Sequence, residues 1–201
     1  LTFVANYTQT HNKIMYWNEQ ESTDENITNL RYRNFKRFPA LTLSLTAAPR
    51  MGVWSPQLIL FCQKQWFDIE RLGSKLDLSK PIWGILWNNT FDFKDNWIAE
   101  TRLKVTSKGI TENSELTRNN CAFNFSVRKA FLNDRLSVTV GVNDLFNRSA
   151  NQLLLYTNNL SIDTKQEFDS REFYVTLRYK FNTARSKYKG TGAGQSERKR
   201  F

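Results

Sequence analysis

The chain has 201 residues and a formal net charge of +10, which is enough length for one sizeable domain. Its mean hydropathy is -0.57, and no apolar run approaches the ~20 residues of a membrane-spanning helix, so a helical membrane protein is excluded. Strands that alternate apolar and polar side chains remain compatible with a membrane, because a β-barrel has a polar lumen.

The first third of the chain predicts three long strands separated by an acidic loop and a short turn. Leu1, Phe3, Ala5 and Tyr7 alternate with polar residues, as one face of a strand does. Pro39 interrupts the second strand, which a bulge or an exposed rim tolerates. The third strand is apolar on both faces, so its lipid face is not assigned. We expect strands over residues 1–17, 28–48 and 53–68, a loop over 18–27 and a turn over 49–52.

The middle of the chain repeats the same long pattern. A charged loop is expected over residues 70–79, and a polar loop over 107–118. Between them, the apolar side chains of 82–93 lie on one face, and a turn at Lys94–Asn96 leads into a strand that begins at Trp97.

The segment from Asn119 to Phe146 predicts a hairpin. Two alternating arms flank Asn133 and Asp134, which tolerate the left-handed backbone of tight turns. Each arm has about a dozen residues, longer than the ~5–6 of soluble strands and long enough for the roughly 9–11 that cross a bilayer. A long loop over 148–170 then precedes a last strand ending at Phe181.

Together these elements predict an all-β fold, an antiparallel up-and-down transmembrane β-barrel segment of about eight long strands. Tight turns near residues 51, 95 and 134 alternate with longer loops near 22, 74, 112 and 158, as short periplasmic turns and long extracellular loops do. Aromatic side chains gather near the tight turns and are expected to form the girdle at the membrane interface. These interface residues are Trp54, Phe93, Trp97, Phe131 and Phe181.

The end of the chain loses the alternating pattern. We expect a barrel domain over 1–182 and a basic, flexible C-terminal tail over 183–201. The tail carries no aromatic platform or recognition helix, so we expect it to be solvated or to face anionic lipid rather than to bind nucleic acid. The first residue is leucine, and we expect the chain to be part of a longer protein or a mature chain without its beginning.

Few residues could support catalysis or metal binding. His11 alone builds neither a catalytic pair nor a metal site. Cys62 and Cys121 lack metal-ligand spacing, and we interpret them as single buried thiols, although a disulfide between them stays open. We therefore expect no enzyme activity, no cofactor and no metal.

Short motifs in the second half resemble those of a known family. They are Lys129–Phe131, Asp144–Asn147 (DLFN) and Tyr179–Phe181, in that order before the end of the last strand. With Thr10–Ile14 and Tyr32–Phe35, they make the chain resemble the C-terminal barrel of TonB-dependent receptors, especially the outer-membrane β-barrel family common in Bacteroidetes. The SKYKGTGAG segment, residues 186–194, resembles C-terminal extensions of some members.

The resemblance implies a bacterial outer-membrane protein that takes up a nutrient. Its chain would be an open part of a barrel of roughly 22 strands, plugged by an N-terminal domain and energised through TonB. Its partners would be outer-membrane lipid, the rest of the same barrel with its plug domain, and TonB. The DLFN residues are interpreted as structural, since a strand-end Asp and Asn satisfy backbone groups where pairing ends.

Two other functions remain open. One is a complete eight-stranded outer-membrane barrel with a structural or adhesive role, because eight strands can close around packed side chains. The other is a soluble β-sandwich or lipocalin-like binder, against which the length of the arms and the outward tryptophans argue.

Overall fold

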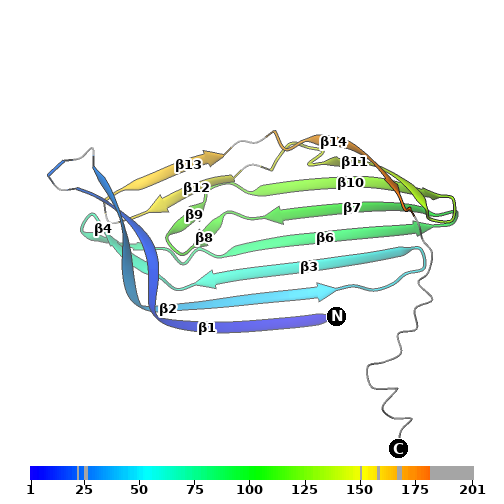
Figure 1. The fold of residues 1–201 in the computed structure, drawn as a ribbon. Helices are drawn as coiled ribbons and strands as arrows, with labels where there is room; N and C mark the ends of the chain where they lie inside the picture. The colour runs from blue at the N-terminus through cyan, green and yellow to red at the C-terminus, as the bar shows by residue number, and fades with distance from the viewer. Residues whose placement is uncertain (22, 25–26, 150, 158, 167–168, 182–201) are drawn as a thin grey trace, which may run out of the picture.

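The structure, a computed structural model, describes residues 1–21, 23–24, 27–149, 151–157, 159–166 and 169–181. Its main feature is an antiparallel sheet of eight long strands in the order β1-β2-β3-β6-β7-β10-β11-β14, drawn in Figure 1 as a curved wall. These strands are β1 (Thr2–Gln20), β2 (Thr28–Ala47), β3 (Trp54–Gln65), β6 (Ile82–Phe93), β7 (Trp97–Thr106), β10 (Asn120–Phe131), β11 (Leu136–Asn143) and β14 (Glu172–Tyr179). The tail expected over 183–201 lies outside the described residues.

The sheet is open, as the sequence predicted for part of a larger barrel. Each long strand pairs with its neighbour along the chain, and β1 and β14 are the two edges. Between the described residues of these two edge strands there is no backbone pairing. The tight turns lie at one end of the sheet, on the right of Figure 1, and the longer connections lie at the other, the long-loop end.

The long connections contain short strands that the sequence analysis treated as loops. One hairpin is formed by β4 (Asp68–Arg71) and β5 (Ser74–Asp77). A second sheet, in the order β13-β12-β9-β8, joins the loop after β7 to the loop after β11. Its strands are β8 (Gly109–Thr111), β9 (Ser114–Leu116), β12 (Asn151–Tyr156) and β13 (Ser161–Gln166). Strands of three to six residues are too short for a clear alternating pattern, which is why the prediction missed them.

Several predicted boundaries of the long strands were wrong by a few residues. β1 continues into the predicted acidic loop, and β3 ends three residues before the predicted end at 68. Pro39 causes no bulge, because the β1–β2 register is one-to-one on both sides of it. The hairpin turn after β10 has four residues rather than two, since Phe131 pairs with Leu136 and the turn residues include three with positive φ.

The strand registers sort the long strands into one apolar face and one polar face. On β14 the side chains of Phe173, Val175 and Leu177 are about 70% exposed, and the registers continue this face across the sheet to Phe3 on β1. The apolar face of β3, which the sequence left unassigned, contains Leu58, Leu60 and Cys62. Residues of this face include Phe3, Leu43, Leu45, Leu58, Leu60, Ile85, Trp87, Leu103, Val105, Phe123, Val127, Val138, Val140, Phe173, Val175 and Leu177.

The cysteines and the histidine lie in the sheet as single residues. Cys62 and Cys121 are free and lie on the apolar face. They are half-buried rather than fully buried, which corrects the expectation of buried thiols. His11 is exposed on β1, where its ring lies 3.2 Å from the Gln9 side chain.

A compact apolar cluster lies at the long-loop end, where β1 and β2 bend away from the wall toward β4, β12 and β13 (Figure 1). The rings of Trp17, Phe35, Phe67 and Phe38 contact one another in series, with centroids 5.0–5.4 Å apart. Leu78 is completely buried beneath them. This cluster gives the long loops a small core of their own. No local sequence pattern predicted this cluster, because its members come from segments far apart in the chain.

Two glycines on the polar face each lie under an aromatic ring of the neighbouring strand. Gly84 is opposite Phe61, and Gly141 is opposite Tyr174. A Cβ atom at Gly84 would also fall 2.7 Å from the backbone oxygen of Val105, whereas the three atoms nearest to one at Gly141 all belong to the Tyr174 side chain, at 2.5–2.9 Å.

We therefore predict that Gly84→Ala destabilises the sheet more than Gly141→Ala does. The backbone oxygen of Val105 cannot move without breaking the ladder, but the Tyr174 ring can rotate away. Overpacking of this kind costs about 1–3 kcal/mol at Gly84, and we expect less than ~1 kcal/mol at Gly141. Urea unfolding in lipid vesicles, followed by tryptophan fluorescence, measures both, and equal losses would contradict the steric account.

Candidate functional site

The aromatic residues predicted for the membrane interface lie together at the tight-turn end of the apolar face. Phe93 pairs with Trp97, which pairs with Lys129 two residues before Phe131, and these three rings are 43–47% exposed. The rings of Trp54 and Phe91 are stacked with centroids 6.2 Å apart, and Phe91 stacks on Phe93 at the same distance. Phe181 contacts Tyr179 beyond the end of β14. The predicted set lacked Phe91, which lies within the same row, and Tyr179, which contacts Phe181.

A cation accompanies this aromatic row. The Lys129 ammonium lies 4.9 Å from the centre of the Trp97 ring and 5.9 Å from that of Phe131. It also donates a hydrogen bond to the backbone oxygen of Asp95 in the adjoining turn. A lysine on an apolar face is stable where its stem covers apolar surface and its charge reaches a polar boundary, as it does here.

A buried polar group stands within the apolar face and holds Trp54 in place. The Trp54 indole donates a hydrogen bond to Asn89 Oδ1 at 3.0 Å, and Asn89 Nδ2 donates to Thr101 Oγ1 at 3.1 Å. Asn89 is only 6% exposed, so both ends of its amide are satisfied away from solvent. Sequence reasoning missed this residue because its partners lie on two other strands.

The polar face carries a shallow hollow of about 350 Å³ in the middle of the wall. Asn88 donates a hydrogen bond to Gln57 at 3.1 Å, and Asn143 donates to Glu172 at 3.1 Å. Amide, hydroxyl and charged groups on this face suit contact with water or with a polar domain. It is lined by the polar-face residues Asn88, Thr90, Glu100, Arg102, Asn124, Ser126, Asn143 and Tyr174, and also by Asn89, Thr101 and Phe125, which lie between them in sequence and belong to the register row of the apolar face.

One buried glutamine ties the wall to its long loops. Gln65, at the end of β3, donates hydrogen bonds to the backbone oxygens of Leu78 and Glu112, and its Oε1 accepts one from the Glu112 N–H, each at 2.7 Å. Glu112 also forms an ion pair with Lys13 of β1 at 2.8 Å. Three separate segments therefore meet at one side chain.

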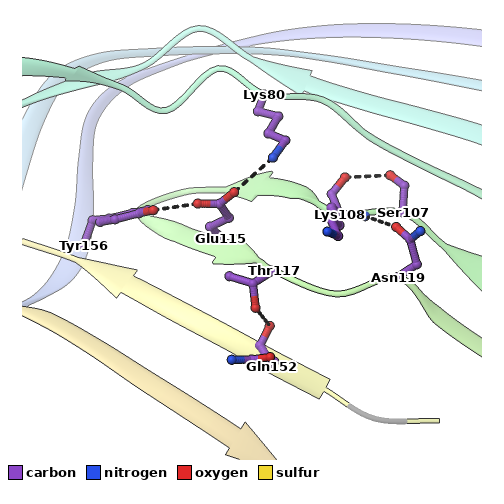
Figure 2. A network of polar contacts seen from close by, with 8 residues as sticks. All are labelled: Lys80, Ser107, Lys108, Glu115, Thr117, Asn119, Gln152 and Tyr156. Carbon is purple, nitrogen blue, oxygen red and sulfur yellow. Dashed lines mark hydrogen bonds and ion pairs between the residues drawn. The ribbon is translucent and has the colours of Figure 1, made fainter. Parts of the chain in front are cut away.

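The second sheet is held to the wall by a chain of polar contacts, shown in Figure 2. Glu115 on β9 accepts a hydrogen bond from the Tyr156 hydroxyl of β12 at 2.6 Å and one from Lys80 Nζ at 3.0 Å. The Tyr156 ring has a second partner, because the Arg71 guanidinium lies 5.6 Å from its centre. Three connections that are distant in sequence, those after β3, β7 and β11, thus converge on one carboxylate and one phenol.

These contacts change the acidities of both groups. Burial raises the pKa of Glu115, but the hydrogen bonds from Tyr156 and Lys80 outweigh burial and leave that pKa below its ordinary value. Burial, then the hydrogen bond and the charge of Glu115, raise the pKa of Tyr156 to about 12. The Glu115 contribution to stability is present above the ordinary carboxyl pKa and falls in acid. The Tyr156 contribution is complete below pH ~10 and is lost as the pH rises through about 12.

The DLFN segment has the structural role that the sequence predicted. Asp144 follows β11 and is 3% exposed. Its carboxylate accepts hydrogen bonds from the backbone N–H groups of Arg148 and Ser149, at 3.2 and 2.8 Å, and from the Ser170 hydroxyl. Burial raises the pKa of Asp144, but these three hydrogen bonds outweigh burial and leave the pKa low. Asn147 accepts from Ser170 as well, so both DLFN polar residues close the loop that precedes β14.

Neither a metal centre nor a spanning helix emerges from the described part of the chain. Within it, no group of three or more His, Cys, Asp or Glu side chains is arranged to hold a metal ion. Within the same ranges, no helix has the length and apolarity needed to cross a membrane.

Comparison with known proteins gives one finding. The family model of the outer membrane protein beta-barrel family matches residues 1–179, nearly the whole chain. No curated protein and no solved structure matches it.

The pKa of Tyr156 gives a direct prediction. Replacing the charged partner by Glu115→Gln should move the Tyr156 titration from about 12 back toward 10, because the negative charge that opposes phenolate formation is gone. Phenolate absorbance, with Tyr156→Phe used to identify the relevant step, measures this shift. An unchanged midpoint in Glu115→Gln would show that the carboxylate does not contact the phenol in solution.

Proposed function

Because the chain belongs to the outer membrane protein beta-barrel family and lies in the bacterial outer membrane, we propose that it forms the C-terminal wall of a TonB-dependent receptor that takes up a nutrient. The single observation that carries the proposal is the open sheet. Its apolar face is continuous, and its two edge strands, β1 and β14, do not pair with each other. An unpaired strand edge is costly in lipid, so each edge requires another strand.

In this proposal the two faces of the wall have different partners. The apolar face contacts outer-membrane lipid, and Trp54, Phe93, Trp97, Phe131 and Phe181 form the girdle at the inner interface. The polar face, with its amide-rich hollow, lines a lumen and contacts a plug domain. The long loops, held by Gln65 and Glu115, face the outside of the cell. The protein has no catalytic role in this account.

A complete eight-stranded barrel with a structural or adhesive role is the alternative. It requires β1 to pair with β14 around an interior filled by side chains. In the described residues β1 and β14 are not paired with each other, which favours a wider barrel.

The size of the native polypeptide distinguishes the two functions. Antibodies against the loop sequence of residues 152–166 should detect, in outer membranes of the source bacterium, a protein far larger than 23.6 kDa, as a plug and roughly 22 strands require. A heat-modifiable band at about 23.6 kDa would support the small barrel and contradict the receptor.

The assignment of lipid and lumen faces is tested by matched substitutions on β11. Val140→Arg places a charge on the apolar face and should cost about 2–4 kcal/mol of assembly free energy in lipid. Thr139→Arg places the same side chain on the polar face of the adjacent position and should cost little. Reversible folding into vesicles measures both, and equal costs would contradict the assignment.

A further inference from the structure

Part of the β2 strand has an open edge at the long-loop end. β2 pairs with β1 along its length, but its register with β3 begins only at Ala40. The Pro39 backbone oxygen accepts a hydrogen bond from the Trp66 N–H at 3.0 Å, which is the last rung toward β3. In an antiparallel ladder every second residue directs its N–H and C=O to the same side. The N–H and C=O groups of Arg37 and Phe35 therefore point to the same side of β2 as the Pro39 oxygen, where β3 no longer pairs with β2.

No strand in the described ranges takes the vacated position. The nearby β4–β5 hairpin forms a two-stranded sheet that pairs only within itself. Between the β2 edge and this hairpin lies a cleft of about 740 Å³, within the range of ligand-binding sites. Its lining residues are Phe35, Lys36, Arg37, Pro39, Trp66, Phe67, Asp68, Lys75, Asp77 and Ser79.

The cleft combines an aromatic surface with excess positive charge. Trp66 is 43% exposed, and Phe67 beside it is buried. Asp68 lies 3.8 Å from Lys75, and Asp77 accepts a hydrogen bond from the Ser79 N–H at 2.9 Å. Lys36 and Arg37 are exposed on the edge, and Lys64 lies over the Trp66 ring at 5.5 Å. The lining thus holds three cations against two carboxylates, and with the neighbouring Lys64 the excess charge of the cleft is positive.

We propose that this cleft binds an extended acidic peptide, which adds a short strand to β2 at Phe35 and Arg37. The peptide backbone pairs with the unpaired N–H and C=O groups of Phe35 and Arg37, and its acidic side chains meet Lys36 and Arg37. Its apolar side chains lie against Trp66. Such strand addition takes affinity from main-chain hydrogen bonds and selectivity from the side-chain environment. A free anion or a sugar could meet the cations or the ring but would leave the strand rungs unpaired. This site is independent of the receptor proposal.

The test uses the whole protein purified from outer membranes in detergent. The probe is a blocked pentapeptide, Glu-Leu-Glu-Val-Glu, and its charge-reversed counterpart has Lys for Glu. Tryptophan fluorescence titration should show saturable binding of the acidic peptide and at least tenfold weaker binding of the basic one. Two further versions of the acidic peptide each carry N-methyl groups on one of the two alternate sets of backbone nitrogens. Because a strand directs alternate N–H groups to opposite sides, one version should lose binding and the other should keep it. Equal binding of both methylated forms, or of free glutamate, would overturn strand addition.

Two substitutions at one position separate the backbone from the charge. Arg37→Pro removes the N–H that faces the cleft and leaves the ladder to β1 intact, as Pro39 already does two residues away. Arg37→Gln keeps the N–H and removes only the charge. We expect Arg37→Pro to weaken binding more than Arg37→Gln does, by about a further five- to tenfold, the loss of one hydrogen bond.

Lys94→Gln, an exposed charge change in the tight turn after β6, is the matched control and should bind normally. Equal losses for the two Arg37 variants would identify a simple charge contact and contradict the proposal. If Arg37→Pro does not assemble, the comparison of the two methylated peptides on the unmodified protein decides the outcome.

Discussion

Backbone hydrogen bonding between neighbouring strands is the constraint on which the rest of this structure depends. In the hydrocarbon of a bilayer no water is available to satisfy N–H and C=O groups, so each must find a partner on an adjacent strand. The eight long strands meet this demand through antiparallel registers that continue from β1 to β14. Because registers fix which side chains share a face, the same pairing produces the continuous apolar surface and the polar wall behind it.

The two ends of the wall are stabilised in different ways. At the tight-turn end, short connections and aromatic side chains lie close to the lipid face, and Asn89 holds Trp54 through a buried hydrogen bond. At the long-loop end, the strands extend beyond the sheet and fold over an apolar cluster around Trp17 and Phe67. Gln65 and Glu115 then fix the loops to that cluster through hydrogen bonds. The loops are therefore a folded layer with its own core rather than loose connections.

The sequence predicted those features that depend on local pattern. The alternation on β6 and the tight turn at Lys94–Asn96 depend on near neighbours, and both were predicted. The pairing of β9 with β12 joins Leu116 to Leu153 across more than thirty residues, and no local pattern encodes it. Asn89 and Gln65 were missed for the same reason, since each acquires its role from partners on other segments. The interface girdle was predicted from aromatic placement, and its contact with lipid stays a prediction.

The central claim is that alternate residues of one strand face lipid and water, and β14 allows the most direct measurement. In a variant with Cys62→Ser and Cys121→Ser, single cysteines at 172 to 178 are labelled with a fluorophore in vesicles that contain brominated lipid. The account predicts strong lipid quenching at 173, 175 and 177, and access to a water-soluble quencher at 172, 174, 176 and 178. Quenching without a period of two, or with the opposite phase, would contradict it.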